Sequence, residues 1–215
     1  MDFTLRITEI FHSLQGEGLA SGLPTVFVRL TGCPLRCHYC DSEYAFHGGQ
    51  KYDLDAIITE VDSYGAKEVC VTGGEPLAQP NCLVLLERLC DCGYHVSLET
   101  SGAMSIEGVD PRVSVVLDLK TPDSGESTKN DYSNLARLSQ GDQIKFVICS
   151  EADFQWARFK IDELSLLSGP AELLFSASFT QLKPQQLAQW IIDARLPVRM
   201  QLQMHKYLWG DVPGR

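Results

Sequence analysis

Three cysteines stand close together in the run Cys33-Pro34-Leu35-Arg36-Cys37-His38-Tyr39-Cys40. The run follows Gly32 and an apolar segment, Thr25–Leu30. Three thiolates on one short loop suit a cubane iron–sulfur cluster, because each binds one iron and the fourth iron stays open to a small ligand. The spacing therefore indicates a [4Fe–4S] cluster held by Cys33, Cys37 and Cys40.

Two other interpretations of this loop stay open at this point. A structural zinc site needs four ligands in a closed tetrahedron. His38, His47 or Cys70 would have to supply the fourth ligand, and none of them completes a recognisable second pair. The second alternative is a chance grouping of structural or redox-active thiols.

The other five cysteines resemble core residues, because buried cysteine behaves as a small hydrophobe. They lie in or beside apolar or helix-like runs: Cys70, Cys82, Cys90, Cys92 and Cys149. The first residues show no basic stretch followed by an apolar segment, so we expect no secretory signal and no disulfide framework. The sequence favours a soluble cytoplasmic protein with free thiols.

Further polar groups follow other apolar runs. They form the segments Val71–Pro76, Glu99–Gly102 and Asp118–Pro122. Gly73 and Gly74 let the backbone approach a ligand closely, and backbone amides together with the Glu75 carboxylate could hold an ammonium group. For the other two segments, position alone leaves ligand contact and loop capping equally open.

Apolar strand-like runs alternate with helix-like segments along the chain. The predicted strands are Thr25–Leu30, Glu68–Thr72, His95–Glu99, Val113–Leu119, Gln143–Cys149, Glu172–Ala177 and Val198–Gln203. The predicted helices are Asp53–Tyr64, Asn81–Cys92, Asp131–Leu138, Glu151–Leu167 and Pro184–Ala194. The strands are too apolar for a sheet with one solvated face, so we expect parallel strands covered by helices.

This alternation predicts a single α/β domain with right-handed crossovers. A full eight-fold barrel usually needs about 250 residues, and this chain has 215. We therefore expect a shortened, partly open barrel of the (β/α)6 type, with ligands at the carboxyl ends of its strands. Two segments are expected to be loops: Phe11–Gly18, before the first strand, and Asp123–Asp131.

The formal net charge is −10, from 18 basic and 28 acidic residues. An acidic surface repels phosphate backbones, so we expect no nucleic-acid partner. A local pocket can still carry positive charge and take a small anion. No apolar run approaches the roughly 20 residues that span a bilayer, so we expect no membrane association.

The pattern C-x3-C-x-aromatic-C after the first strand resembles the radical S-adenosylmethionine (SAM) superfamily. In that superfamily the open iron binds the amino and carboxylate groups of SAM, and the reduced cluster cleaves SAM to a 5′-deoxyadenosyl radical. Tyr39 fills the aromatic place, whose neighbourhood contacts adenine. The resemblance implies one radical SAM domain over residues 1–215.

The sequence further resembles the 7-carboxy-7-deazaguanine synthase family of the queuosine pathway. The resemblance runs from residue 10 to the end and is carried by Phe11–Gly18, Phe27–Cys33, Cys40–Ser42, Thr72–Pro76, Glu99–Gly102 and Gln203–Leu208. It implies a lyase-type ring contraction of 6-carboxy-5,6,7,8-tetrahydropterin to 7-carboxy-7-deazaguanine with loss of ammonia. The implied cofactors are the [4Fe–4S] cluster, reusable SAM and Mg²⁺.

Site residues follow from the same resemblance. Those implied to bind substrate are Leu14, Gln15, Gly16, Arg29, Thr72 and His205, with the Arg29 guanidinium on the substrate carboxylate. Ser42 is implied to ligate Mg²⁺, and the residues implied to line SAM are Tyr39, Gly74, Ser101, Lys120 and Ser176. The family also implies a homodimer and an electron donor such as flavodoxin.

Two features depart from the family pattern. Many relatives have threonine at the position of Ser42, which keeps the hydroxyl but fixes its rotamer less strongly. In some relatives the chain ends soon after the last motif and its final residues approach the substrate, whereas here the segment Trp209–Arg215 extends further.

Two rival functions stay open. A glycyl-radical-enzyme activase has a similar size, but Cys90 and Cys92 are too close together to resemble its extra cluster-binding pairs. A non-enzymatic iron–sulfur or zinc module would need neither the Gly-Gly turn nor the Leu14–Gly18 loop.

Overall fold

The computed structural model describes residues 3–210, 212 and 214, so Asp211, Pro213 and Arg215 of the C-terminal extension lie outside the described residues. The described strands form one sheet in the order β3-β1-β2-β4-β5-β6-β7-β8-β9. Their bounds are Thr4–Leu14 (β1), Pro24–Leu30 (β2), Gln50–Asp53 (β3), Glu68–Gly73 (β4), His95–Thr100 (β5), Ser114–Asp118 (β6), Gln143–Ile148 (β7), Glu172–Ala177 (β8) and Arg199–Gln201 (β9).

From β2 to β9 every neighbouring pair is parallel, whereas β1 pairs antiparallel with both β2 and β3. The sheet order is linear, with β3 and β9 at its two ends, so the described strands make an open sheet rather than a closed barrel. The predicted α/β class and its partly open architecture are confirmed.

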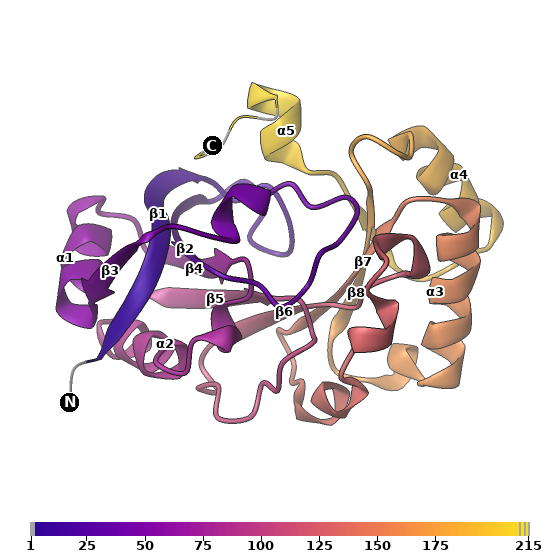
Figure 1. Cartoon of the computed structure of the whole chain (residues 1–215). Helices are drawn as coiled ribbons and strands as arrows, with labels where there is room; N and C mark the ends of the chain where they lie inside the picture. Colours follow the sequence, from indigo (N-terminus) through magenta and orange to yellow (C-terminus); the bar gives the residue numbers. More distant parts are fainter. Residues whose placement is uncertain (1–2, 211, 213, 215) are drawn as a thin grey trace.

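Five α-helices accompany the sheet within the described residues (Figure 1). They are α1 (Leu54–Ser63), α2 (Cys82–Asp91), α3 (Glu151–Glu163), α4 (Pro184–Asp193) and α5 (Met204–Trp209). Helix α1 packs against β1 and β3, α2 against β5, α3 against β7 and α4 against β8. The short α5 lies apart from these four, above the loops of the N-terminal part (Figure 1).

Local signals explain where the helices begin. The Asp53 carboxylate accepts a hydrogen bond from Ala56 N at 2.7 Å at the start of α1, and the Ser150 hydroxyl accepts one from Asp153 N at 3.3 Å at the start of α3. These side chains replace the partners that the first turn of a helix lacks. Pro184 opens α4, where its missing N–H costs nothing.

Two apolar clusters fill the space between the sheet and the helices. One gathers β1, β2, β4 and β5 with α1 and α2, and the other gathers β6, β7 and β8 with α3 and α4. Strand residues alternate between the two faces of the sheet, so one face supplies this core and leaves the other face for a site.

The structure differs from the sequence prediction at several elements. Residues 4–14, in part predicted as a loop, form β1, because the alternating residues Leu5 and Ile7 reach the core. Neither β3 nor α5 was predicted. The predicted helix Asp131–Leu138 is a 3-10 segment, Tyr132–Arg137, in which the buried Asn134 side chain accepts from Ile106 N instead of facing solvent.

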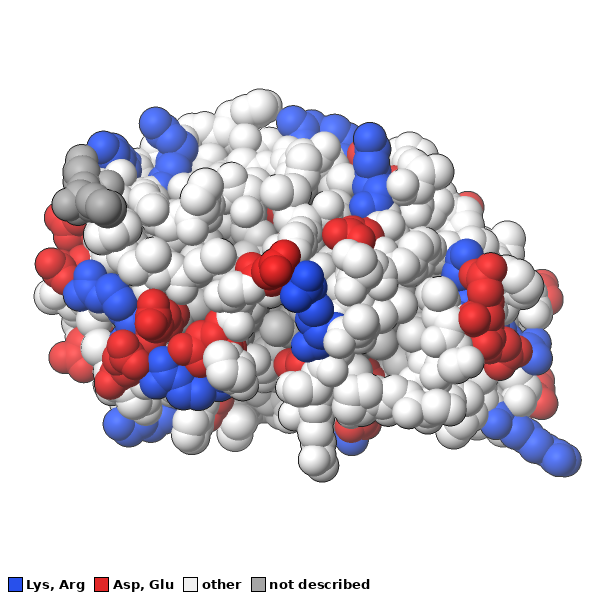
Figure 2. Space-filling model, turned by 90° about the horizontal axis from the view of Figure 1, so that it is seen from below, with Lys and Arg blue, Asp and Glu red and all other residues white. Residues whose placement is uncertain are grey.

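The molecular surface carries charges of both signs. Figure 2 shows acidic and basic side chains intermixed on one face, with wide uncharged areas between them. Among the described residues, no helix is both long enough and apolar enough to cross a bilayer.

Candidate active site

One pocket collects a polar side chain from each of six adjacent parallel strands, β2 and β4 to β8. These side chains are Arg29, Thr72, Glu99, Asp118, Lys145 and Ser176. Their strand neighbours, such as Val28 and Val71, belong to the apolar core. Because side chains alternate along a strand, the polar residues of the pocket lie on one face of the sheet and the apolar core residues lie on the other. We call these six residues the strand row.

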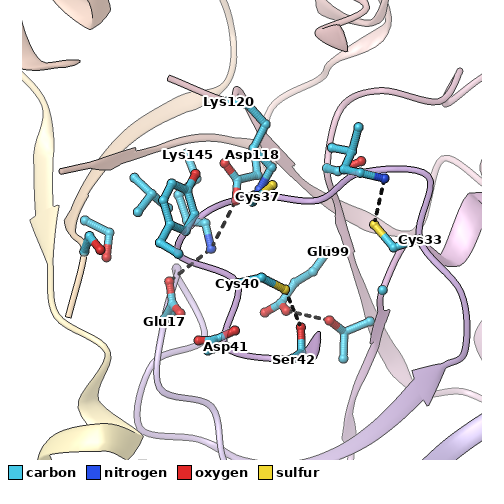
Figure 3. A pocket seen from close by; sticks show the side chains of 18 of the residues that line it. Glu17, Cys33, Cys37, Cys40, Asp41, Ser42, Glu99, Asp118, Lys120 and Lys145 are labelled. Atoms are coloured by element: carbon cyan, nitrogen blue, oxygen red, sulfur yellow. Dashed lines mark hydrogen bonds and ion pairs between the residues drawn. The ribbon is translucent and has the colours of Figure 1, made fainter. Parts of the chain in front are cut away.

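The cysteine loop closes one side of this pocket. Cys33, Cys37 and Cys40 all line it, and all three are free thiols (Figure 3). Burial raises the pKa of the Cys33 thiol, and it raises the pKa of Cys37 to about 11. A metal that takes these thiolates must therefore displace their protons. The Ser42 hydroxyl lies 3.8 Å from the Cys40 sulfur.

A mononuclear zinc cage is not formed by the described residues, because no three His, Cys, Asp or Glu side chains among them converge on one ion position. His38 directs its Nδ1 to the Asp123 carbonyl oxygen at 3.1 Å. His47 is exposed, and Cys70 is fully buried in β4. None of the three candidate fourth ligands completes a set with the cysteine loop.

The Gly-Gly turn packs directly against the cysteine loop. A Cβ built on Gly74 would lie 2.1 Å from the Gly32 carbonyl oxygen, so only glycine permits this approach. The turn therefore brings bare backbone to the pocket wall beside the thiols.

Glu75 behaves differently from the sequence expectation. Its carboxylate is fully buried and accepts from the Ser101 amide at 2.7 Å, the Ser101 hydroxyl at 2.5 Å, the Thr100 hydroxyl at 3.0 Å and the Leu77 amide at 3.0 Å. These donors belong to the protein itself. Glu75 thus fixes Ser101, which lines the pocket, and does not face a ligand.

Two buried polar atoms in the pocket wall have no hydrogen-bond partner among the described residues: the Tyr39 hydroxyl and Asp118 Oδ1. Buried polar groups are normally paired. The other Asp118 oxygen accepts from Lys120 Nζ at 2.8 Å. Burial opposes the charge of Lys120, yet Asp118 raises its pKa well above the usual value. This part of the pocket fits a ligand that offers both a donor and an acceptor.

Lys145 and Glu17 form a partly buried ion pair that was not predicted from the sequence. Lys145 Nζ lies 3.2 Å from Glu17 Oε2 and 3.8 Å from Asp118 Oδ2 (Figure 3). Burial alone would lower the pKa of Lys145, but Glu17 and Asp118 outweigh it and raise the pKa. A lysine inside the apolar strand run was the signal available in the sequence.

Arg29 is held from three sides. Its Nε donates to Glu9 Oε1 at 2.8 Å, and its Nη1 donates to the Gly73 carbonyl oxygen at 3.3 Å. The Tyr44 hydroxyl donates to the same Glu9 oxygen at 2.7 Å, and the Phe11 ring lies 5.9 Å from the guanidinium carbon. Burial opposes its charge, but Tyr44 and Glu9 raise the pKa of Arg29 overall. A cation held this way suits an anionic ligand group.

The structure gathers most of the sequence-predicted site residues around this pocket. Those that line it are Arg29, Cys33, Cys37, Tyr39, Cys40, Ser42, Thr72, Gly74, Ser101, Lys120 and Ser176. Leu14, Gln15, Gly16 and His205 are not among the residues that line it, and their direct contact with substrate stays a prediction. Gln15 Nε2 donates to Glu99 Oε1 at 3.3 Å, so Gln15 contacts the strand row.

Comparison with known proteins agrees with this geometry. The model of the radical SAM superfamily, whose members use a [4Fe–4S] cluster and SAM, matches residues 27–122. The chain is 44% identical to the 7-carboxy-7-deazaguanine synthase of Chlorobaculum tepidum, over 96% of this chain and 94% of the relative. It is 41% identical to that of Koribacter versatilis, over 95% and 97%. The crystal structure of QueE from Escherichia coli has the same fold, with a TM-score of 0.77 at 22% identity over 94% of this chain and 95% of that one. The chain therefore belongs to the 7-carboxy-7-deazaguanine synthase family of radical SAM enzymes.

Proposed function

We propose that this chain converts 6-carboxy-5,6,7,8-tetrahydropterin to 7-carboxy-7-deazaguanine with loss of ammonia. The observation that carries the proposal is that the three cysteines and the Arg29 guanidinium line one pocket. A radical-generating cofactor and an anion-binding group are thereby offered to the same small molecule. Membership in a family that bears this enzyme's name supports the choice of reaction.

The cofactor half of the proposal assigns the cluster to Cys33, Cys37 and Cys40. When bound, the cluster and SAM supply a one-electron reduction and the abstraction of a hydrogen atom. The remaining wall, with Tyr39, Gly74, Ser101, Lys120 and Ser176, holds SAM. The unpaired Tyr39 hydroxyl and the bare backbone at Gly74 support this assignment.

The substrate half of the proposal centres on Arg29. Its guanidinium binds the substrate carboxylate, since Glu9 and Tyr44 hold it in a fixed orientation at the pocket wall. Thr72, on the neighbouring strand, contacts substrate, and so do Leu14, Gln15, Gly16 and His205. The Ser42 hydroxyl ligates Mg²⁺, a hard cation that accepts one protein oxygen and keeps several waters.

The wider setting belongs to the same proposal. We assign one radical SAM domain to residues 1–215, a homodimeric assembly, a cytoplasmic location and a reductant such as flavodoxin. Arg36 and His38 lie exposed on the cysteine loop, so a protein reductant can approach the cluster from outside. Sedimentation of the purified chain tests the dimer, and turnover with flavodoxin and its reductase tests the donor.

The test of function is anaerobic reconstitution with iron, sulfide, SAM, Mg²⁺ and reductant, followed by incubation with the carboxytetrahydropterin and mass analysis. We expect 7-carboxy-7-deazaguanine and ammonia in equal amounts. Cys37→Ala should abolish both the cluster and turnover. Arg29→Ala should raise the substrate KM far more than it changes SAM cleavage, whereas Arg88→Ala, which removes an exposed ion pair between α2 and α1, should change neither. Substrate returned unchanged by the cluster-loaded wild-type chain would refute the proposal.

A further inference from the structure

The segment 201–206, here called the clasp, joins the pocket wall from the C-terminal side. The Met204 amide donates to the Gly16 carbonyl oxygen at 3.0 Å, and Gln201 Oε1 accepts from the Gly18 amide at 2.7 Å. The clasp is therefore bonded to the loop that follows β1. A Cβ built on Gly16 would lie 2.1 Å from His205 Nδ1, so the two segments are in tight contact.

The clasp also reaches the cysteine loop through an ion pair. Lys206 Nζ lies 2.8 Å from Asp41 Oδ2, and only 8% of the Lys206 surface is exposed. Its ammonium group is 5.3 Å from the centre of the Phe179 ring, a second favourable contact for a cation.

Gln203 connects the two contacts. Its side-chain Nε2 donates to Glu17 Oε1 and to Asp41 Oδ2, each at 3.2 Å. One amide thus bridges carboxylates from two loops that are far apart in the sequence. Figure 3 shows Glu17 and Asp41 side by side at the edge of the pocket.

We propose that Gln203 and Lys206 are positioning residues for the corner Cys40–Ser42, and this inference rests on the proposed function. Asp41 stands between a cluster ligand and the proposed Mg²⁺ ligand, and the clasp fixes it from outside the loop. Consecutive Cα atoms are about 3.8 Å apart, so any shift of Asp41 carries the Ser42 hydroxyl with it. Mg²⁺ demands near-ideal octahedral geometry and tolerates such a shift poorly.

The Gln203 and Lys206 side chains act on one half of the pocket. They contact Glu17 in the loop after β1, Asp41 beside the cysteine loop and the Phe179 ring, whereas the proposed SAM residues Ser101, Lys120 and Ser176 stand at the carboxyl ends of β5, β6 and β8. Gln201, at the start of the clasp, is the strand partner of Ser176, and replacing Lys206 leaves that pairing intact. With a cluster bound, Cys40 would be held by its own sulfur, whatever the state of the clasp. Loss of the clasp should therefore weaken the use of Mg²⁺ and substrate and leave SAM cleavage in place.

The experiment compares Lys206→Met, Lys206→Arg and Asp41→Asn in the reconstituted holoenzyme. The matched control is Lys160→Met, which removes a lysine that also pairs with a carboxylate and lies over aromatic rings, but on α3. A misplacement of about 1 Å can cost about 10²-fold in rate. We expect Lys206→Met to lower kcat/KM about 10- to 100-fold and to raise the Mg²⁺ concentration for half-maximal turnover. Iron content and substrate-free formation of 5′-deoxyadenosine should stay within about twofold of wild type, and Lys206→Arg should recover most of the loss.

Hydrogen–deuterium exchange of the same holoenzymes supplies a readout that needs no turnover. In Lys206→Met and in Asp41→Asn, peptides covering 40–46 and 201–209 should both exchange faster, while Lys160→Met changes neither. Faster exchange confined to 201–209, with unchanged Mg²⁺ dependence, would overturn the inference and leave α5 a merely structural helix. If wild type does not turn over the pterin, yet both peptides exchange faster in Lys206→Met and Asp41→Asn, the proposed function fails. The coupling between the clasp and the corner Cys40–Ser42 then still stands.

Discussion

Replacing Glu75 with glutamine tests how the Gly-Gly turn is joined to Ser101. The two Glu75 oxygens accept two backbone amides, one from Leu77 and one from Ser101. Glutamine offers a single carbonyl oxygen, so in either orientation its NH₂ group faces one of those N–H donors. One backbone N–H is left without a partner in a fully buried site, and a charge-assisted set of hydrogen bonds becomes neutral.

The structure sets the size of this effect. An unsatisfied buried donor costs about 1–3 kcal/mol, and loss of the charged acceptor adds a comparable amount, so we expect about 3 kcal/mol of destabilisation. For a chain of this length each kcal/mol shifts Tm by about 2–4 °C. Glu75→Gln should therefore lower Tm by about 6–12 °C and weaken SAM binding, because Ser101 loses its anchor.

The assay is thermal unfolding of the reduced, cluster-free chain followed by circular dichroism, with SAM affinity measured separately on the reconstituted enzyme. Glu87→Gln, on the exposed side of α2, is the matched control and should leave Tm within about 1 °C of wild type. An unchanged Tm in Glu75→Gln would show that the buried carboxylate is not holding the turn and would refute the reasoning.

Three further predictions follow from single contacts. Burial raises the pKa of Cys149 to about 12, so alkylation with iodoacetamide should reach the exposed Cys92 first at neutral pH and reach Cys149 only as the pH rises. Equal labelling rates for both thiols at neutral pH would contradict this assignment. Between pH 9.0 and about 12 the folded chain keeps the Cys149 proton that the unfolded chain loses, so the free energy of unfolding should fall as the pH rises through this range. Gly16→Ala places a methyl group on the His205 ring and should cost about 1–3 kcal/mol in urea unfolding, with a wild-type midpoint as the opposing result. Lys145→Met removes a cation from Glu17 and Asp118, which keep Gln201, Gln203 and Lys120 as partners, and should cost about 1.5–3 kcal/mol by the same measurement; a loss below about 0.5 kcal/mol would mean that the ion pair is dispensable.

Elements whose sequence pattern is complete within a short stretch of the chain were predictable from the sequence. Each parallel strand is an apolar run, and α1 begins at a capping aspartate, so the α/β class and most element positions followed directly. The three cysteines of the loop also lie within eight residues, and their spacing indicates an iron–sulfur cluster. Both cases rest on neighbours along the chain.

Features that depend on partners across the sheet were not predictable. Nothing around Glu9 marks it as the residue that orients Arg29, since the two meet only when β1 pairs with β2. In the sequence Lys145 is only a charged residue within an apolar strand, and its partner Glu17 becomes evident only in the folded structure. The antiparallel strands β1 and β3 were also obscured, because β1 has buried positions only at Leu5 and Ile7 and β3 has none.

The strand row has a thermodynamic consequence for the whole molecule. Its members come from β2 through β8, so a ligand that touches both ends of the row exists in the bound form only while the intervening strands stay paired. Occupancy is thus linked to global unfolding rather than to a local opening, and a ligand at 100 times its Kd adds about 2.7 kcal/mol to the stability of the entire sheet. No fragment that lacks an outer strand of the row retains the complete binding surface.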